Sequence, residues 1–326
     1  MDRRVRICLV LFGLFLLAAS PLWSAETFRV GFPSLATGFA ASWVTADKGT
    51  WRKHDLDVEL IYLRGGATTV SALIGGSVHF ILGSDVGTVI AILQGAGLTK
   101  LGVTTNTLGY SILTQPNIKS IQDLRGKILG ITPGRDAAYA RLSKILRENG
   151  MDPAKDVKFL PLGGGPEGRL AALKTGVIHA TMFTPPTDLI GERAGLKVLQ
   201  KLDVANVGGG LSTTTSFLQK NRSLVIRFLK GYIEGIQYMK AHRNESLKIF
   251  SKYTRSQDAA VMAHLYEEIA TRVEPGLRPR TDAVRGLLDL VALDYPQAQR
   301  LSEKDHWDVS LLDEIQKSGF LDQISK

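Results

Sequence analysis

The sequence predicts an α/β protein of two lobes, each a mostly parallel sheet flanked by helices, with a helical C-terminal tail on the first lobe. Two observations predict this fold. The phrase VSALIGGSVHF, residues 70–80, returns as LAALKTGVIHA, residues 170–180, with Ala, Leu, Gly and His at the same four places. Strand-like and helix-like segments alternate around both phrases, an order typical of a parallel sheet with helical crossovers. We therefore interpret the repeat as two similar lobes.

The chain opens with the features of a secretory signal peptide. Three Arg residues precede an apolar run over residues 7–19, and the small residues Ser24 and Ala25 follow it. The run is shorter than the roughly 20 residues that cross a bilayer. We expect residues 1–25 to be cleaved and the mature chain to be exported to the periplasm or another extracytoplasmic space, without being embedded in the membrane.

The composition argues against a disulfide-stabilised protein and against a nucleic-acid-binding protein. The only cysteine, Cys8, lies inside the apolar run, so the mature chain has no disulfide. A chain of this length buries enough surface to need none. The net charge is +9, but the basic residues are scattered rather than clustered. Because nucleic-acid binding needs a basic patch, we expect no nucleic-acid partner.

The first lobe begins with a short apolar strand and a loop rich in turn residues. Residues 56–63, LDVELIYL, alternate apolar and polar side chains as a strand does. In order, we expect a strand at 28–32, a helix at 40–48, a strand at 56–63, a helix ending at 74 and a strand at 78–83.

The second lobe repeats this order. Pro33 and Pro133 each follow the first strand of their lobe. We expect a strand at 127–131, a helix ending at Gly150, a strand at 157–162, a glycine-rich loop and helix at 163–176 and a strand at 177–183.

Two segments, near residue 116 and near residue 210, are interpreted as paired crossings between the lobes. They divide the chain into a first part of lobe 1 at 26–114, lobe 2 at 115–210, and the return to lobe 1 with the C-terminal helices at 211–326. From Asn221 onward the apolar spacing is helical, interrupted by a loop at 274–280.

Several phrases in this order resemble one protein family. GSDVGTVIAILQGAGL, SIQDLRGKILGITPG and AALKTGVIHATMFTPP are similar to phrases of the extracytoplasmic solute-binding proteins of ABC importers, in the SsuA/THI5-like or NMT1-like branch. The resemblance implies a type II periplasmic-binding-protein fold that closes around its ligand by a hinge motion. It also implies a membrane permease and its ATPase subunit as partners, and nitrate, sulfonates, taurine or thiamine pyrimidine precursors as ligands. We expect a monomer.

His79 and His179 depart from the family, which more often carries Asp at these places. Two such histidines could hold a metal across a cleft, but the other four show no supporting spacing. We therefore expect structural roles for both, and neither a metal nor a cofactor. Gly163, Gly165 and Gly168 formally match a dinucleotide motif, but Pro166 restricts the loop and no acidic residue closes the next strand, so we expect only a sharp turn.

The loops at the carboxyl ends of the strands are the expected ligand site, because helix N-termini offer free N–H groups there. The candidate ligand-binding residues are Ser34, Thr37, Gly38, Gly65, Gly66, Ser84, Asp85, Thr132, Gly134, Arg135, Asp136 and Thr184.

Different side chains in this set suggest different roles. The hydroxyls can donate hydrogen bonds, and Arg135 could either clamp a sulfonate or carboxylate or lie on the solvent side of its turn. Together, Asp85 and Arg135 would complement a zwitterion. Ser84, Asp85 and Asp136 could instead only cap helices. Trp43 and Trp51 could line the cleft, although packing between helices is the preferred interpretation.

The predicted function is capture of a small organic anion or zwitterion for an importer, without catalysis. The alternative is an enzyme of the same two-lobed fold. A THI5-like enzyme would need a cysteine-rich motif, which the mature chain lacks, and a menaquinone-pathway dehydratase would not carry a signal peptide.

Overall fold

The computed structural model describes residues 27–133, 137–302 and 306–324. The predicted signal peptide at 1–25 lies outside these residues. Over the ranges described, no helix is long and apolar enough to cross a membrane.

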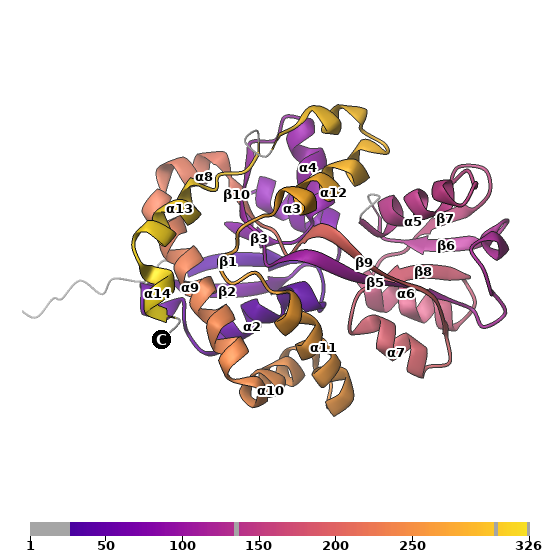
Figure 1. Cartoon of the computed structure of the whole chain (residues 1–326), viewed down its shortest axis with the longest axis horizontal. Helices are drawn as coiled ribbons and strands as arrows, with labels where there is room; N and C mark the ends of the chain where they lie inside the picture. The colour runs from indigo at the N-terminus through magenta and orange to yellow at the C-terminus, as the bar shows by residue number, and fades with distance from the viewer. Residues whose placement is uncertain (1–26, 134–136, 303–305, 325–326) are drawn as a thin grey trace, which may run out of the picture.

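The first sheet has five strands in the order β2-β1-β3-β10-β4 (Figure 1). Strand β1 pairs in parallel with β2 and β3, whereas β10 runs antiparallel to β3 and β4. The strands of this sheet and the helices between them are β1 (Thr27–Phe32), η1 (Thr37–Phe39), α2 (Ala40–Asp47), η2 (Arg52–His54), β2 (Asp57–Tyr62), α3 (Gly66–Ile74), β3 (Phe80–Leu82), α4 (Asp85–Leu93), β4 (Leu98–Gly102) and β10 (Leu211–Thr214).

The second sheet repeats this arrangement with the order β7-β6-β8-β5-β9. Strand β6 pairs in parallel with β7 and β8, and β5 runs antiparallel to β8 and β9. The strands of this sheet and the helices between them are β5 (Thr105–Thr114), η3 (Gln122–Leu124), β6 (Ile128–Ile131), α5 (Ala137–Glu148), β7 (Lys158–Pro161), α6 (Gly165–Lys174), β8 (Ala180–Phe183), α7 (Thr187–Arg193) and β9 (Lys197–Gly208). The prediction of two similar, mostly parallel sheets is confirmed.

The long strands β5 and β9 join the two lobes. They pair with each other along most of their length, and they leave and re-enter the first lobe next to β4 and β10. The sequence analysis did not predict these strands. Strand β5 belongs to the second sheet, although the expected boundary places residues up to 114 in the first lobe. The lobe boundaries stay a prediction.

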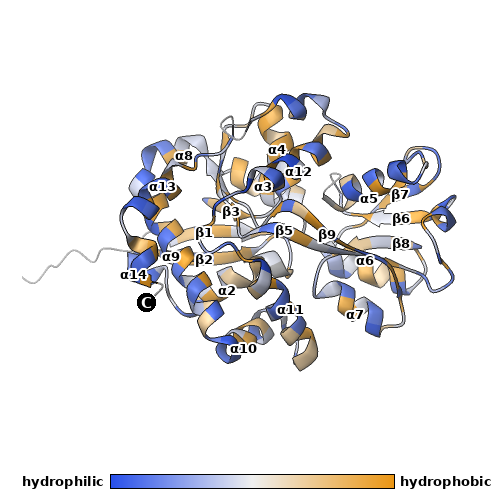
Figure 2. Cartoon of the chain, in the orientation of Figure 1, coloured by the Kyte–Doolittle hydropathy of each residue, from blue (hydrophilic) through white to orange (hydrophobic). Residues whose placement is uncertain are grey.

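The C-terminal third, from residue 215 onward, is helical, and most of it packs on the first sheet. Its helices are α8 (Thr215–Lys220), α9 (Arg222–Ala241), α10 (Arg243–Thr254), α11 (Ala259–Arg272), α12 (Thr281–Ala292), η4 (Pro296–Arg300), α13 (Ser310–Lys317) and α14 (Phe320–Ile324). Apolar strands lie between helices whose outer faces are hydrophilic (Figure 2). Burial of the apolar faces, rather than any covalent link, therefore holds the layers together.

Both candidate tryptophans belong to this core. Trp43 and Trp51 are fully buried, and Trp51 stacks on Phe228 of α9 and donates its indole N–H to the Phe228 carbonyl at 3.0 Å. The packing interpretation is the one the structure supports.

His79 and His179 occupy equivalent places in the two lobes. The His79 Nδ1 atom accepts from the Arg29 main-chain N–H at 3.1 Å, and the His179 Nδ1 atom accepts from the Ile128 N–H at 3.2 Å. The His79 imidazole thus joins the start of β3 to β1, and the His179 imidazole joins the start of β8 to β6 in the same way, which explains why the repeat carries the same residue twice. The described ranges contain no group of three or more His, Cys, Asp or Glu residues placed to hold a metal.

Candidate functional site

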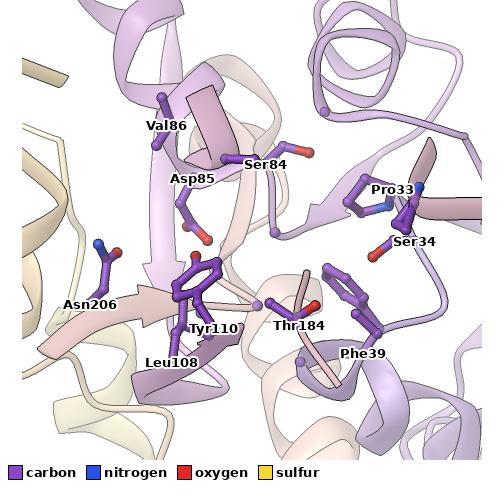
Figure 3. Close-up of a pocket in the computed structure, with 18 of the residues that line it drawn as sticks. Pro33, Ser34, Phe39, Ser84, Asp85, Val86, Leu108, Tyr110, Thr184 and Asn206 are labelled. Carbon is purple, nitrogen blue, oxygen red and sulfur yellow. The ribbon is translucent and has the colours of Figure 1, made fainter. Parts of the chain in front are cut away.

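A cavity of about 230 Å³ lies between the lobes, at the carboxyl ends of strands from both sheets (Figure 3). Loops after β1, β2 and β3 line it from the first lobe. Loops after β6, β7 and β8 line it from the second lobe, and β5 and β9 run along it. This is the position at which ligands bind to open α/β sheets.

Several helices begin at this cavity. The first residues of α3, α4 and α6 line it, and Ala138 in the first turn of α5 does so too. The first N–H groups of a helix have no partner within the helix, and the helix dipole favours negative charge there. The cavity therefore offers hydrogen-bond donors from both lobes to an anionic group.

Eight of the predicted residues line this cavity: Ser34, Gly38, Gly65, Gly66, Ser84, Asp85, Thr132 and Thr184. Thr37 lies in η1 beside them. Gly134, Arg135 and Asp136 lie outside the described residues, so the predicted Arg135 clamp remains untested. That these residues bind a ligand is still a prediction.

Ser84 has a strained backbone at the start of α4. Its φ is 58° and its ψ is 30°, in the left-handed region that residues with a side chain rarely adopt. It occupies the N-cap position, but its side chain makes no capping hydrogen bond. Its hydroxyl is buried without a hydrogen-bond partner among the described residues. A capping role therefore does not explain the left-handed backbone of Ser84. Backbone strain of this kind is concentrated at functional sites.

Asp85 faces the cavity but already has a positive partner. Its carboxylate forms an ion pair with the Lys100 ammonium, which is fully buried, and accepts from the Gly210 main-chain N–H at 3.2 Å. The Lys100 ammonium also lies 4.8 Å from the centre of the Trp307 ring. Since the Asp85 charge is neutralised within the protein, the expected pairing of Asp85 with a ligand cation loses its main support.

The sequence analysis missed Arg169, a buried cationic residue that lines the cavity. It lies on α6 and is 6% exposed. Its guanidinium donates to the Thr132 hydroxyl and lies 5.7 Å from the centre of the Phe183 ring. The local signal was weak, because Arg169 immediately precedes the repeated phrase at a position where the first copy has Thr69.

Much of the remaining lining is apolar. Side chains of Phe39, Val86, Leu108, Met182 and Leu287 contribute to it. At one side, Glu268 and Arg272 of α11 pair with each other at 3.0 Å, so their charges largely cancel. Such a cavity favours an organic ligand with an apolar body over a bare inorganic ion.

Polar contacts also link α11 and α7 to β5. Asp188 accepts from the Ser111 hydroxyl at 2.8 Å, and its carboxylate lies 3.7 Å from His264 Nε2. Burial alone would raise the pKa of Asp188, but hydrogen bonds from His264, Ser111 and the Leu189 N–H outweigh it and lower that pKa. The Asp188 carboxylate in turn raises the pKa of His264.

Another contact crosses the cleft from β2 to α6. The Tyr62 hydroxyl donates to the Glu167 carboxylate at 3.2 Å, and burial raises the pKa of Tyr62 to about 12. The lobes thus touch directly beside the cavity.

The family model described as NMT1/THI5 like matches residues 36–246, which covers every strand of both sheets except β1, and all the cavity loops except part of the first. The chain belongs to the NMT1/THI5-like family. Proteins of Brucella abortus and Brucella suis that are named as binding proteins are 32% identical to it over 108 residues. The match covers 32% of this chain and 33% of theirs, so it spans about a third of the length of these curated relatives.

Solved structures share the fold of this NMT1/THI5-like chain. The periplasmic aliphatic sulphonate binding protein SsuA from Escherichia coli superimposes with a TM-score of 0.64 at 20% identity, over 84% of this chain and 88% of SsuA. A Candida albicans protein with the generic periplasmic binding protein fold gives 0.69 at 15% identity, over 90% and 95%. The expected periplasmic-binding-protein fold is confirmed. The desulfurization enzyme DSZB gives 0.57 at 14% identity, over 91% and 99%, so the fold alone does not choose between binding and catalysis.

Proposed function

We propose that this chain is the extracytoplasmic solute-binding component of an ABC importer, and that it captures a small organic anion or zwitterion between its lobes. The observation that carries the proposal is the cavity itself, where strand ends and helix N-termini of both lobes meet. Family membership and the SsuA-like neighbours support a solute-binding role.

The ligand classes proposed are sulfonates, taurine, nitrate and thiamine pyrimidines. One helix N-terminus contributes roughly 0.3–2 kcal/mol, whereas micromolar affinity needs about 8 kcal/mol. Hydrogen bonds from groups such as Ser84 and Arg169, together with burial of an apolar body, must supply the rest. This comparison favours the organic members of the set over nitrate.

The cellular setting follows from the same proposal. The mature chain would act as a monomer in the periplasm after removal of residues 1–25. Closure about β5 and β9 would present both lobes to a permease that is driven by its ATPase subunit.

An enzyme of this fold is the second candidate, because DSZB shares the architecture. The cavity argues against it. None of the described residues that line the cavity is Cys, His or Lys, and Asp85 is held by Lys100. The serine and threonine hydroxyls of the described lining therefore have no histidine or lysine within that lining to act as a general base, and the Glu268 carboxylate is paired with Arg272.

A thermal-shift panel tests the proposal. The mature protein is mixed with taurine, alkanesulfonates, nitrate, aromatic and alicyclic carboxylates and thiamine pyrimidines, and the unfolding midpoint is recorded. A ligand at a hundredfold its Kd adds about 2.7 kcal/mol to the stability of the folded state. We expect a raised midpoint with at least one organic anion.

Two variants locate the binding. Leu108→Trp fills the cavity and should abolish the shift, whereas Ile74→Trp, at an exposed position outside the cavity, should preserve it. No shift with any compound, or equal shifts in both variants, would contradict the proposal. Conversion of a bound compound to a product would favour the enzyme.

A further inference from the structure

Two polar side chains on the strands that join the lobes have hydrogen-bonding atoms with no partner in the described part of the chain. Thr105 of β5 is 1% exposed and Asn206 of β9 is 3% exposed, and both line the cavity. Neither the Thr105 hydroxyl oxygen nor the Asn206 Nδ2 atom has a hydrogen-bond partner among the described residues. Buried polar groups are normally paired, so each needs an explanation.

Neighbouring residues of the same types show what a structural role looks like here. The Thr104 hydroxyl contacts the Gly209 carbonyl at 2.9 Å and the Tyr232 hydroxyl at 3.0 Å. Asn106 donates to Glu274 and to the Arg278 carbonyl, and accepts from the Arg280 N–H at 2.8 Å. Thr104 and Asn106 thus use their side chains to hold the fold, whereas the Thr105 hydroxyl and the Asn206 Nδ2 atom make no such bond within the part of the chain that the structure describes.

The local strand geometry places the two unpaired groups at one end of the cavity. Thr105 pairs with Gly208, and a shift in register follows before Thr107 pairs with Ala205, so Asn206 sits in an irregularity of β9. A Cβ atom on Gly208 would lie 2.4 Å from the Thr105 hydroxyl oxygen, so only glycine allows this approach. Figure 3 shows Asn206 and Asp85 on the side of the cavity away from Pro33 and Ser34.

We propose that Thr105 and Asn206 form a polar subsite that binds an uncharged oxygen acceptor, such as a carbonyl, at the far end of the ligand's apolar body. The inference rests on the proposed solute-binding function. An amide N–H and a hydroxyl both donate to an oxygen acceptor, and the adjacent Asp85–Lys100 pair adds no net charge. Leu108, Val86 and Leu287 line the cavity as well and would contact the apolar body. The ligand is thus an organic acid with a second, neutral oxygen group.

The test uses a matched pair of probes, cyclohexanecarboxylate and 4-oxocyclohexanecarboxylate, which differ by one carbonyl group. Calorimetry on the mature wild-type protein should show tighter binding of the keto acid by about tenfold, because its carbonyl pairs donors that the parent acid leaves unpaired. Asn206→Leu and Thr105→Val should each reduce this preference, and the double variant should remove it.

Stability of the unliganded protein separates a ligand role from a structural one. Asn206→Leu and Thr105→Val should leave the unfolding midpoint unchanged or raise it, because they remove unpaired groups. Asn106→Leu and Thr104→Val, which break existing hydrogen bonds, should lower it.

Three results would overturn the inference. One is a fall in midpoint for Asn206→Leu as large as that for Asn106→Leu. The second is equal affinity of the wild-type protein for the two probes, which leaves the proposed solute-binding function standing. The third is failure of the wild-type protein to bind any acid of the panel, which counts against the proposed function and the subsite together.

Discussion

Replacing Asp85 with Asn should leave the Lys100 ammonium buried without its counter-charge. Lys100 is fully buried on β4, and Asp85 at the start of α4 is 9% exposed. The Asn side chain can still accept from the Gly210 N–H, so the loss concerns the charge rather than the shape. The perturbation thus isolates one electrostatic contact beside the cavity.

Breaking a buried pair by removing one partner costs about 3–5 kcal/mol, because the remaining charge is left desolvated. At roughly 2–4 °C for each kcal/mol in a protein of this size, the midpoint should fall by about 6–20 °C. The double variant Asp85→Asn/Lys100→Met removes both charges and keeps similar volumes. It should recover most of the loss.

Urea denaturation of the wild type, both single variants and the double variant gives the coupling energy as a double-mutant cycle. Calorimetry with taurine tests the alternative that Asp85 holds a ligand cation. In that case Asp85→Asn would unfold within about 0.5 kcal/mol of the wild type, but would no longer bind taurine. A stable Asp85→Asn variant would therefore refute the internal pairing derived above.

Two further predictions concern stability away from the cavity. The Asp188 carboxylate raises the pKa of His264, so the contribution of this pair to stability should be complete below the unfolded pKa near 6.5 and be lost as pH rises through the higher folded pKa. Urea titrations at several pH values should show this pH dependence flattened in His264→Gln. A stability profile that is unchanged in the variant would contradict the pairing. A Cβ atom on Gly235 of α9 would lie 1.9 Å from the Thr45 hydroxyl oxygen of α2, so Gly235→Ala should lower the stability of the folded state by about 1–3 kcal/mol through overpacking. The control Gly97→Ala has open space around the added Cβ atom and should change the unfolding midpoint little. Equal midpoints for the two variants would show that α2 and α9 separate without cost.

The sequence by itself determined the two lobes and the loops that meet between them. A repeated phrase and the alternation of strand and helix depend on neighbouring residues, so they are readable without a structure. The same local logic placed Ser34, Gly65, Ser84 and Thr132 at strand ends, and all four line the cavity.

The tertiary structure decided what the site side chains do. Asp85 pairs with a lysine fifteen residues away, and Arg169 reaches Thr132 thirty-seven residues earlier in the chain. Thr105 and Asn206 are 101 positions apart in the sequence, and they line the same cavity because β5 and β9 pair. Such contacts depend on how distant strands come together, and local periodicity carries no information about that.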